Sequence, residues 1–156
     1  MTFAGGSWQL ASSIMRRSVD RLLADVRRRL RRLTPQEAFE LAADGAVLVD
    51  VRSRDEQERQ GGLIPGAVHH PLTVLLWRLD PDVPTSNPKL PLDTRLILIC
   101  REGYSSSLAA AELQAIGFTQ ATDVIGGFDA WLAEGLPVEP VGARAPRDDA
   151  AQSQAR

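Results

Sequence analysis

The residues with the clearest capacity for chemistry surround Cys100, the only cysteine among the 156 residues of the chain. The apolar run RLILI precedes this cysteine, while the polar turn REGYSSS and an alanine-rich stretch follow it. A strand, a short turn and a helix in this order would hold the sulfur rigidly beside a helix N-terminus. Helix N-termini carry unpaired N–H groups and a partial positive charge, which stabilise a thiolate over a thiol. The pattern therefore indicates a nucleophilic cysteine at the floor of an anion-binding loop.

The turn after the cysteine has the composition that such a loop needs. Its backbone N–H groups lack helical partners and are free to surround the sulfur. Arg101 adds a positive charge, and Gly103 permits a backbone conformation that a Cβ would disfavour. The loop residues expected at the site are Arg101, Glu102, Gly103, Tyr104, Ser105 and Ser106. The alternative is an inert buried cysteine, but such a cysteine is usually surrounded by apolar side chains, whereas charged and hydroxyl-bearing residues follow this one.

The single cysteine also limits the class of site. It excludes an intramolecular disulfide and argues against a thiolate-rich metal centre, so we expect neither a metal nor a cofactor. The N-terminus lacks the pattern of a signal peptide, and no apolar stretch approaches the length of a membrane span. We therefore expect a cytoplasmic protein, in which a lone thiol stays reduced.

The elements that would position Cys100 alternate between strands and helices. Thr34 and Glu37 form a capping-box pattern that starts a helix, and Gly45 is placed to end it. The apolar runs AVLVDV and RLILI predict two buried strands, and ATDVIGG predicts a third strand and a turn. Asp50 lies near the C-terminal end of the first strand, where functional residues of such sheets collect. The alternation predicts an α/β fold, with a central parallel sheet covered by helices on both faces.

The N-terminal segment has a charge of its own. Residues 1–33 hold eight arginines against Asp20 and Asp25, although the whole chain has a net charge of −2. From residue 18 to residue 33, leucines and valines recur at helical spacing among the arginines, which predicts a basic amphipathic helix. Its leucine stripe would pack on the domain or on a second copy, so a monomer and a homodimer both stay open. Contact with a membrane or another protein is the alternative, and no nucleic-acid partner is expected; we expect the domain to fold without residues 1–33.

Five segments in series resemble the rhodanese-like family of single-domain sulfurtransferases. They are LTPQEAFEL, VLVDVR, GLIPGAVHHPL, the Cys100 loop with its helix, and VIGGFDAWLAEGLPV. The resemblance implies a rhodanese-like domain over residues 34–138. Residues 1–33 would then be an N-terminal helical extension, and residues 139–156, rich in Ala, Pro and charge, a disordered tail.

The resemblance implies persulfide chemistry at Cys100. The thiolate would take a sulfane sulfur from a small donor such as thiosulfate and pass it to a thiophilic acceptor, a thiol or a protein. That acceptor is external, because the chain has no second cysteine. By resemblance, Asp50 and Arg52 support the loop, and a structural ion pair is their favoured role.

One departure from the family pattern concerns the donor. Many active members carry an arginine five positions after the cysteine, where this chain has Ser105. One cation fewer predicts weak binding of a dianion such as thiosulfate, since a charge-assisted contact is worth about 1.5–3 kcal/mol. Two alternatives stay open: a non-catalytic binding or regulatory module, and a cysteine phosphatase or arsenate reductase. The second is disfavoured, because such loops need an arginine to grip a tetrahedral oxyanion.

Overall fold

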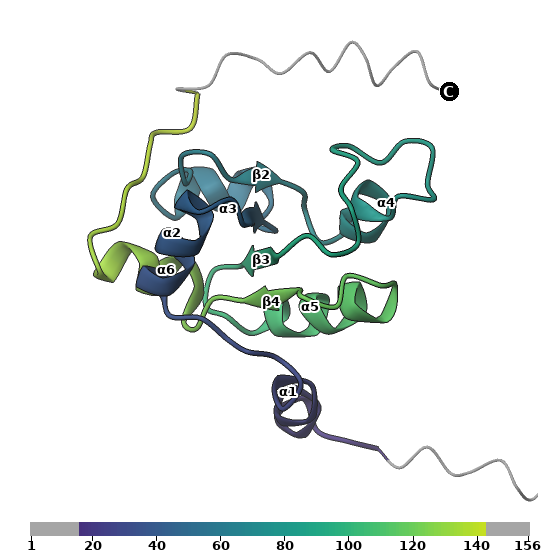
Figure 1. Cartoon of the computed structure of the whole chain (residues 1–156). Coiled ribbons are helices and arrows are strands. Elements are labelled where there is room, and N and C mark those ends of the chain that lie inside the picture. Colours follow the sequence, from purple (N-terminus) through teal and green to yellow (C-terminus); the bar gives the residue numbers. More distant parts are fainter. Residues whose placement is uncertain (1–15, 143–156) are drawn as a thin grey trace, which may run out of the picture.

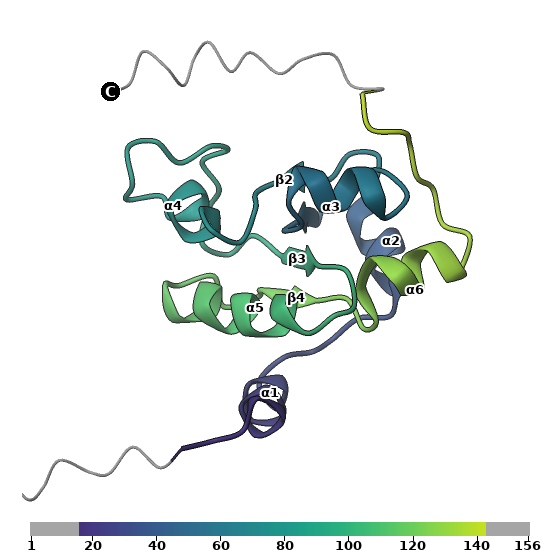
Figure 2. The same cartoon turned by 180° about the vertical axis from the view of Figure 1, so that it is seen from behind.

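A computed structural model describes residues 16–142 and shows a four-stranded parallel sheet between two layers of helices (Figures 1 and 2). The sheet order is β2-β1-β3-β4, so β3, which leads to Cys100, is an inner strand. The α/β prediction is confirmed. The elements are α1 (Val19–Arg27), α2 (Pro35–Ala43), β1 (Val47–Asp50), α3 (Arg54–Arg59), β2 (Val68–His69), α4 (Leu75–Leu79), β3 (Leu96–Ile99), α5 (Ser105–Ala115), β4 (Thr122–Asp123) and α6 (Gly127–Ala133).

The side chains of β3 alternate between two hydrophobic cores. Leu96, Leu98 and Cys100 belong to the core that α4 and α5 cover. Ile97 and Ile99 belong to the core that α2 and α6 cover. All four residues of β3 are fully buried, because this strand pairs on both sides and is covered on both faces. Cys100 therefore directly follows a strand that is held from all sides, which restricts its movement.

Two helices begin with complete capping boxes. At α2, the Thr34 hydroxyl accepts from the Glu37 N–H and the Glu37 carboxylate accepts from the Thr34 N–H, as the sequence predicts. At α3, Ser53 and Glu56 make the same reciprocal pair. No helix was expected in this charged segment. The Ser-x-x-Glu spacing was the available sign of a helix start, but it was not recognised because no apolar run follows it.

The N-terminal segment is shorter as a helix than predicted. Helix α1 ends at Arg27, and the chain then runs beside β4, where Leu33 forms a parallel bridge with Val124. Its leucines point inward: Leu23, Leu30 and Leu33 are all buried. The prediction of one helix over 18–33 is therefore wrong at its C-terminal end, because the chain must extend to pair with β4. The predicted packing of the leucine stripe on the domain is confirmed.

The C-terminal end of the domain also extends beyond its expected boundary. Glu139, assigned to the tail, exchanges two backbone hydrogen bonds with Leu63, both of 2.8 Å. The remainder of the predicted disordered tail, residues 143–156, lies outside the described residues.

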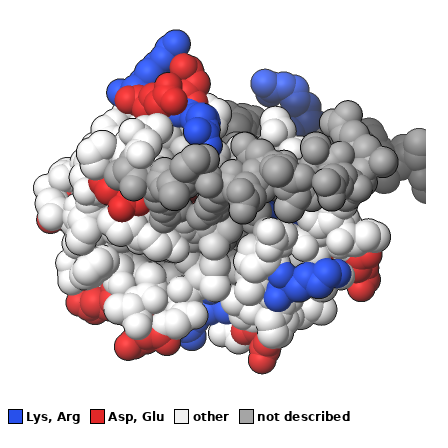
Figure 3. Space-filling view, turned by 90° about the horizontal axis from the view of Figure 1, so that it is seen from above, with Lys and Arg blue, Asp and Glu red and all other residues white. Residues whose placement is uncertain are grey.

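The exterior is mixed in charge on the side that faces away from α1. In Figure 3, acidic and basic side chains are both scattered around the part of this face that is not grey, and neither sign forms a large patch there. None of the helices within residues 16–142 is long and apolar enough to cross a membrane.

Candidate active site

Cys100 occupies the first position after β3, in a loop that leads directly into α5. Its side chain is only 6% exposed. Tyr104 is the N-cap of α5, and no side chain caps this end of the helix. The Ser107 N–H donates to the Tyr104 carbonyl over 3.1 Å, which leaves the N–H groups of Ser105 and Ser106 available to an anion near the sulfur.

The sulfur already has two hydrogen-bonding neighbours. The backbone N–H of Gly103 donates to Cys100 Sγ over 3.1 Å. Cys100 Sγ lies 3.2 Å from Ser106 Oγ, and the Ser106 hydroxyl donates onward to Asp123 over 2.7 Å. Of the expected loop groups, the Gly103 amide and the Ser106 hydroxyl thus contact the cysteine sulfur. Asp123, which the sequence analysis did not single out, joins them from β4.

The start of α6 holds the loop from behind. The N–H of Phe128 donates to the Cys100 carbonyl over 2.8 Å, and the N–H of Asp129 donates to the Arg101 carbonyl over 2.9 Å. Both peptides are trans, so their N–H groups point to the opposite side, away from α6. At Gly127, a Cβ would lie 2.5 Å from the Cys100 carbonyl oxygen. The close approach of α6 therefore depends on this glycine.

Gly103 is essential to the shape of the loop. Its φ is +84°, and a Cβ would lie 2.8 Å from the backbone nitrogen of Gly126. This conformation turns the Gly103 N–H toward the sulfur and its carbonyl toward the N-terminal segment. Arg27 and Arg32 both donate to that carbonyl, over 2.7 and 3.0 Å.

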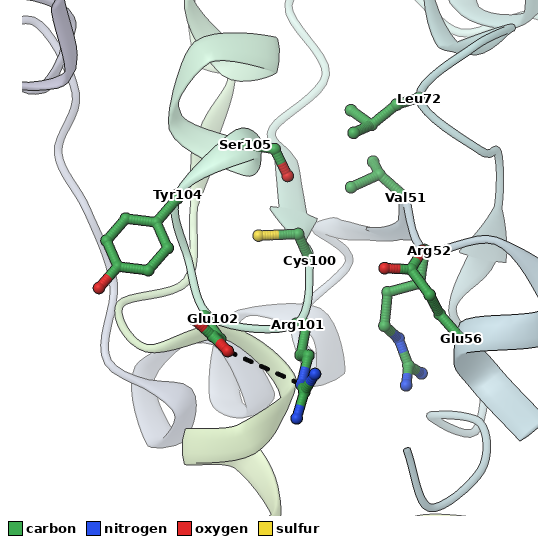
Figure 4. A pocket seen from close by; sticks show the side chains of 9 residues that line it. All are labelled: Val51, Arg52, Glu56, Leu72, Cys100, Arg101, Glu102, Tyr104 and Ser105. Atoms are coloured by element: carbon green, nitrogen blue, oxygen red, sulfur yellow. Dashed lines mark ion pairs between the residues drawn. The ribbon is translucent and has the colours of Figure 1, made fainter. Parts of the chain in front are cut away.

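Asp50 and Arg52 form a buried ion pair at the end of β1. Arg52 donates to both carboxylate oxygens of Asp50 through its Nε and a terminal nitrogen, over 3.0 and 2.8 Å. It also donates to the Gly62 carbonyl and lies 3.6 Å over the ring of Phe128. Its exposed fraction is 1%. The pair thus ties β1 to the loop before β2 and to α6, and the Arg52 guanidinium points away from the sulfur (Figure 4).

The pocket above Cys100 is small and poor in available cations. Its volume is about 220 Å³, and its lining residues are Val51, Arg52, Glu56, Leu72, Cys100, Arg101, Glu102, Tyr104 and Ser105. Val51 and Leu72 lie across the pocket from Cys100, and the Ser105 hydroxyl points into the space between Cys100 and these two side chains (Figure 4). The Cys100 sulfur itself points away from Val51 and Leu72. The Arg101 guanidinium points away from the sulfur and lies near two carboxylates, 3.8 Å from Glu102 and 3.5 Å from Asp129.

The site therefore gathers the predicted loop and adds residues that the sequence did not reveal. Ser105 lines the pocket, and Arg101 does not supply a cation at the sulfur. Arg27, Arg32 and Asp123 were missed, because nothing in the sequence shows that an N-terminal arginine reaches the Cys100 loop. Within residues 16–142, acidic, histidine and cysteine side chains do not cluster in a way that could hold a metal ion.

Comparison with known proteins places this architecture in a family. Residues 34–134 match the family model described as Rhodanese-like domain. The thiosulfate sulfurtransferase GlpE of Pseudomonas entomophila (strain L48) is 36% identical over 104 residues, which are 65% of this chain and 84% of that protein.

Two solved structures resemble the chain as well. A protein of unknown function from Rhodopseudomonas palustris CGA009, described as a possible tyrosine phosphatase, is 31% identical, with a TM-score of 0.71 over 79% of this chain and 95% of that one. The human single-domain sulfurtransferase TSTD1 is also 31% identical, with a TM-score of 0.53 over 66% of this chain and 96% of that one. The order of strands, the cysteine loop and the match over residues 34–134 lead to one conclusion: the chain belongs to the rhodanese-like domain family.

Proposed function

We propose that this protein is a sulfurtransferase that carries sulfur as a persulfide on Cys100. The observation that supports this most directly is the Gly103 N–H, whose nitrogen lies 3.1 Å from a sulfur that no cation among residues 16–142 contacts. Backbone amides of this kind stabilise a sulfur anion without fixing its substituent. The similarity to named sulfurtransferases supports the same chemistry.

The proposed reaction has two displacements at sulfur. The Cys100 thiolate attacks the outer, sulfane sulfur of a donor, the S–S (or S–SO₃) bond of the donor breaks, and a thiolate or sulfite leaves with the electron pair. An acceptor thiolate then attacks the terminal sulfur of the persulfide, and the Cys100 thiolate leaves. The acceptor comes from outside, because Cys100 is the only cysteine of the chain.

The pocket favours an organic persulfide or polysulfide over thiosulfate as the donor. Ser105 stands where a cation would contact a dianion, Arg101 is held near Glu102 and Asp129, and Glu56 adds negative charge to the rim. The wall made by Val51 and Leu72 suits an apolar chain instead. A volume of about 220 Å³ admits a small donor or the end of a thiol side chain.

Intact mass spectrometry tests the persulfide. We expect the reduced chain to gain one sulfur atom from a polysulfide donor and to lose it on addition of a thiol, whereas Cys100→Ser gains none. A native, folded chain that gains no sulfur from polysulfide or thiosulfate would contradict the proposal. The binding or regulatory module would then be the better account of the fold.

A substitution at Ser105 tests the donor class. Ser105→Arg restores one cation to the loop and is expected to raise kcat/KM with thiosulfate about tenfold or more, given the strength of a charge-assisted contact. Glu58→Gln changes the net charge equally at an exposed position and serves as the matched control. An equal gain in both variants would show that general attraction, not the pocket, sets the preference.

Phosphatase activity is the second candidate, because of the similarity to the Rhodopseudomonas palustris protein. The loop offers backbone amides to an oxyanion, but Ser105 and Ser106 bring no guanidinium to grip it. We therefore expect no hydrolysis of an aryl phosphate above that of Cys100→Ser. Hydrolysis that depends on Cys100 would favour this candidate.

A further inference from the structure

The N-terminal segment reaches the back of the Cys100 loop. After α1 it runs beside β4: the Thr122 hydroxyl donates to the Arg31 carbonyl over 2.8 Å, and Leu33 bridges to Val124. Because β4 is the neighbour of β3, this path brings Arg27 and Arg32 to the side of the loop opposite the pocket. Figure 1 shows α1 below α5, with the following chain passing β4.

Two guanidinium groups converge on one carbonyl of the loop. Arg27 and Arg32 donate to the Gly103 carbonyl over 2.7 and 3.0 Å. Arg27 also donates to Ser107 Oγ over 3.0 Å and lies 5.8 Å from the ring centre of Tyr104. Since the peptide after Gly103 is trans and planar, the Tyr104 N–H points away from the arginines. The two arginines thus hold the Gly103–Tyr104 peptide in place, directly next to the Gly103 N–H that donates to the sulfur.

Arg32 acts on the sulfur by a second route, through Asp123. It donates to both carboxylate oxygens of Asp123, over 2.8 and 3.2 Å, and that carboxylate also accepts from the hydroxyls of Ser106 and Ser107. Asp123 is fully buried, so without Arg32 its negative charge would lie uncompensated behind the sulfur site. With Arg32 and Ser107 in place, the Ser106 hydroxyl can turn from Asp123 to donate to a sulfur anion 3.2 Å away.

We propose that Arg27 and Arg32 are positioning residues of the active site. Arg27 and Arg32 hold the Gly103 carbonyl and thereby the loop around the Gly103 N–H. Arg32 also neutralises Asp123, so that the Ser106 hydroxyl can donate to the sulfur. Residues 27–32 are then part of the active site and not an appendage to it. The inference rests on the proposed function only in that the anion stabilised is a sulfur anion.

The test measures Cys100 in the full-length chain by two independent reactions, alkylation by iodoacetamide and sulfur loading from polysulfide, both followed by intact mass spectrometry. Arg32→Met is expected to slow both about tenfold or more, and Arg27→Met to slow them about fivefold, as losses of charge-assisted hydrogen bonds. Arg27→Lys keeps one donor and is expected to recover part of the rate. Arg28→Met is the matched control, because its side chain is 75% exposed, and it should stay within about twofold.

A double variant separates electrostatics from a general structural role. Arg32→Met with Asp123→Asn removes both charges, so it is expected to react faster than Arg32→Met alone, whereas a merely structural contribution would make it slower or equal. Each variant is measured where its near-ultraviolet circular dichroism is native. Unchanged rates in Arg27→Met and Arg32→Met would overturn the inference, as would slow sulfur loading with normal alkylation. If the parent chain is alkylated in an arginine-dependent way but never loads sulfur, the positioning inference stands and the proposed function fails.

Discussion

Two arginine–aspartate pairs with buried carboxylates lie on either side of β3, one at the end of β1 and one at the end of β4. Arg52 and Asp50 are two positions apart in the chain, whereas Arg32 and Asp123 are 91 positions apart. Both aspartates are at most 2% exposed, and both arginines make paired contacts with the carboxylate. The pairs are nearly alike in chemistry, yet they contact different parts of the molecule.

The difference lies in the remaining hydrogen bonds of each pair. Asp50 accepts from Gln57, and Arg52 donates to the Gly62 carbonyl, so this pair joins β1 to α3 and its following loop. Asp123 accepts from Ser106, which contacts Cys100. The short-range pair therefore stabilises the fold, and the long-range pair supports the hydrogen bonds around the sulfur. The role of an arginine–aspartate pair near a nucleophile therefore depends on the other groups to which its carboxylate and guanidinium are hydrogen-bonded.

The largest effect is expected from removal of residues 1–33, which breaks the long-range pair and empties part of the core. Leu23, Leu30 and Leu33 are buried, and a buried leucine lost from a core costs about 2–5 kcal/mol. The sum rivals the total stability of a small domain, about 5–15 kcal/mol. Urea unfolding followed by tryptophan fluorescence should therefore show loss of the cooperative transition. This reverses the expectation from the sequence that the domain folds without residues 1–33, because three leucines of this segment are part of the core. A truncated chain with the same midpoint as the full chain would show that the segment is an independent appendage.

Arg52→Met is expected to have the next largest effect on stability. It leaves Asp50 buried without its cation, which costs about 3–5 kcal/mol for pairs of this kind. The control is Arg59→Met, whose pair with Asp55 is well exposed and is worth about 0–1 kcal/mol. The urea midpoint reports both variants. Equal, small shifts would mean that the Asp50 carboxylate finds other compensation.

Ser106→Ala is expected to change reactivity more than stability. The hydroxyl donates to a carboxylate that keeps three other hydrogen bonds, so the unfolding free energy should fall by only about 1 kcal/mol. The alkylation rate of Cys100 should fall about threefold or more, because the sulfur anion loses a donor. Ser106→Thr keeps the hydroxyl and is the matched control. An unchanged rate in Ser106→Ala would remove Ser106 from the account of the site.

An exposed pair in the same segment gives the smallest expected effect. A hydrogen bond from Arg17, together with the nearby positive charges of Arg28 and Arg21, lowers the pKa of Asp25. Because the folded pKa is below the unfolded one, the stabilisation is present above the usual Asp pKa of about 3.9 and is lost as pH falls through the lower folded pKa. Carboxyl NMR titration of the chain should show this shift, and Arg17→Met should reverse most of it. Solvent screening keeps the contribution of this pair to stability small.

Local sequence signals predicted much of the fold and the centre of the site. The β3 run, the Cys100 turn and the capping box at Thr34 each depend on a few consecutive residues, and the structure has each element where the signal lies. The end of α1 at Arg27 was missed, because it is set by pairing of the following chain with β4. Asp123 and Arg32 were missed for the same reason: only tertiary packing brings together charges 91 positions apart. In a sequence, arginines on an amphipathic segment are read as solvent-exposed, because the pattern does not show whether a distant loop carbonyl accepts their hydrogen bonds.

The most direct test of the account compares Cys100 alkylation by iodoacetamide in Arg32→Met and in Arg52→Met, under conditions where both are native. If Arg52→Met is not folded, Arg52→Lys and Arg32→Lys replace the two methionine variants; the expected difference is then smaller, because lysine keeps the charge and loses only the paired donors. The account predicts that loss of the long-range pair slows alkylation about tenfold, while loss of the short-range pair leaves the rate within about twofold of the parent chain. Equal rates in the two variants, or a slower rate in the Arg52 variant, would contradict the division between a pair that serves the fold and a pair that serves the sulfur.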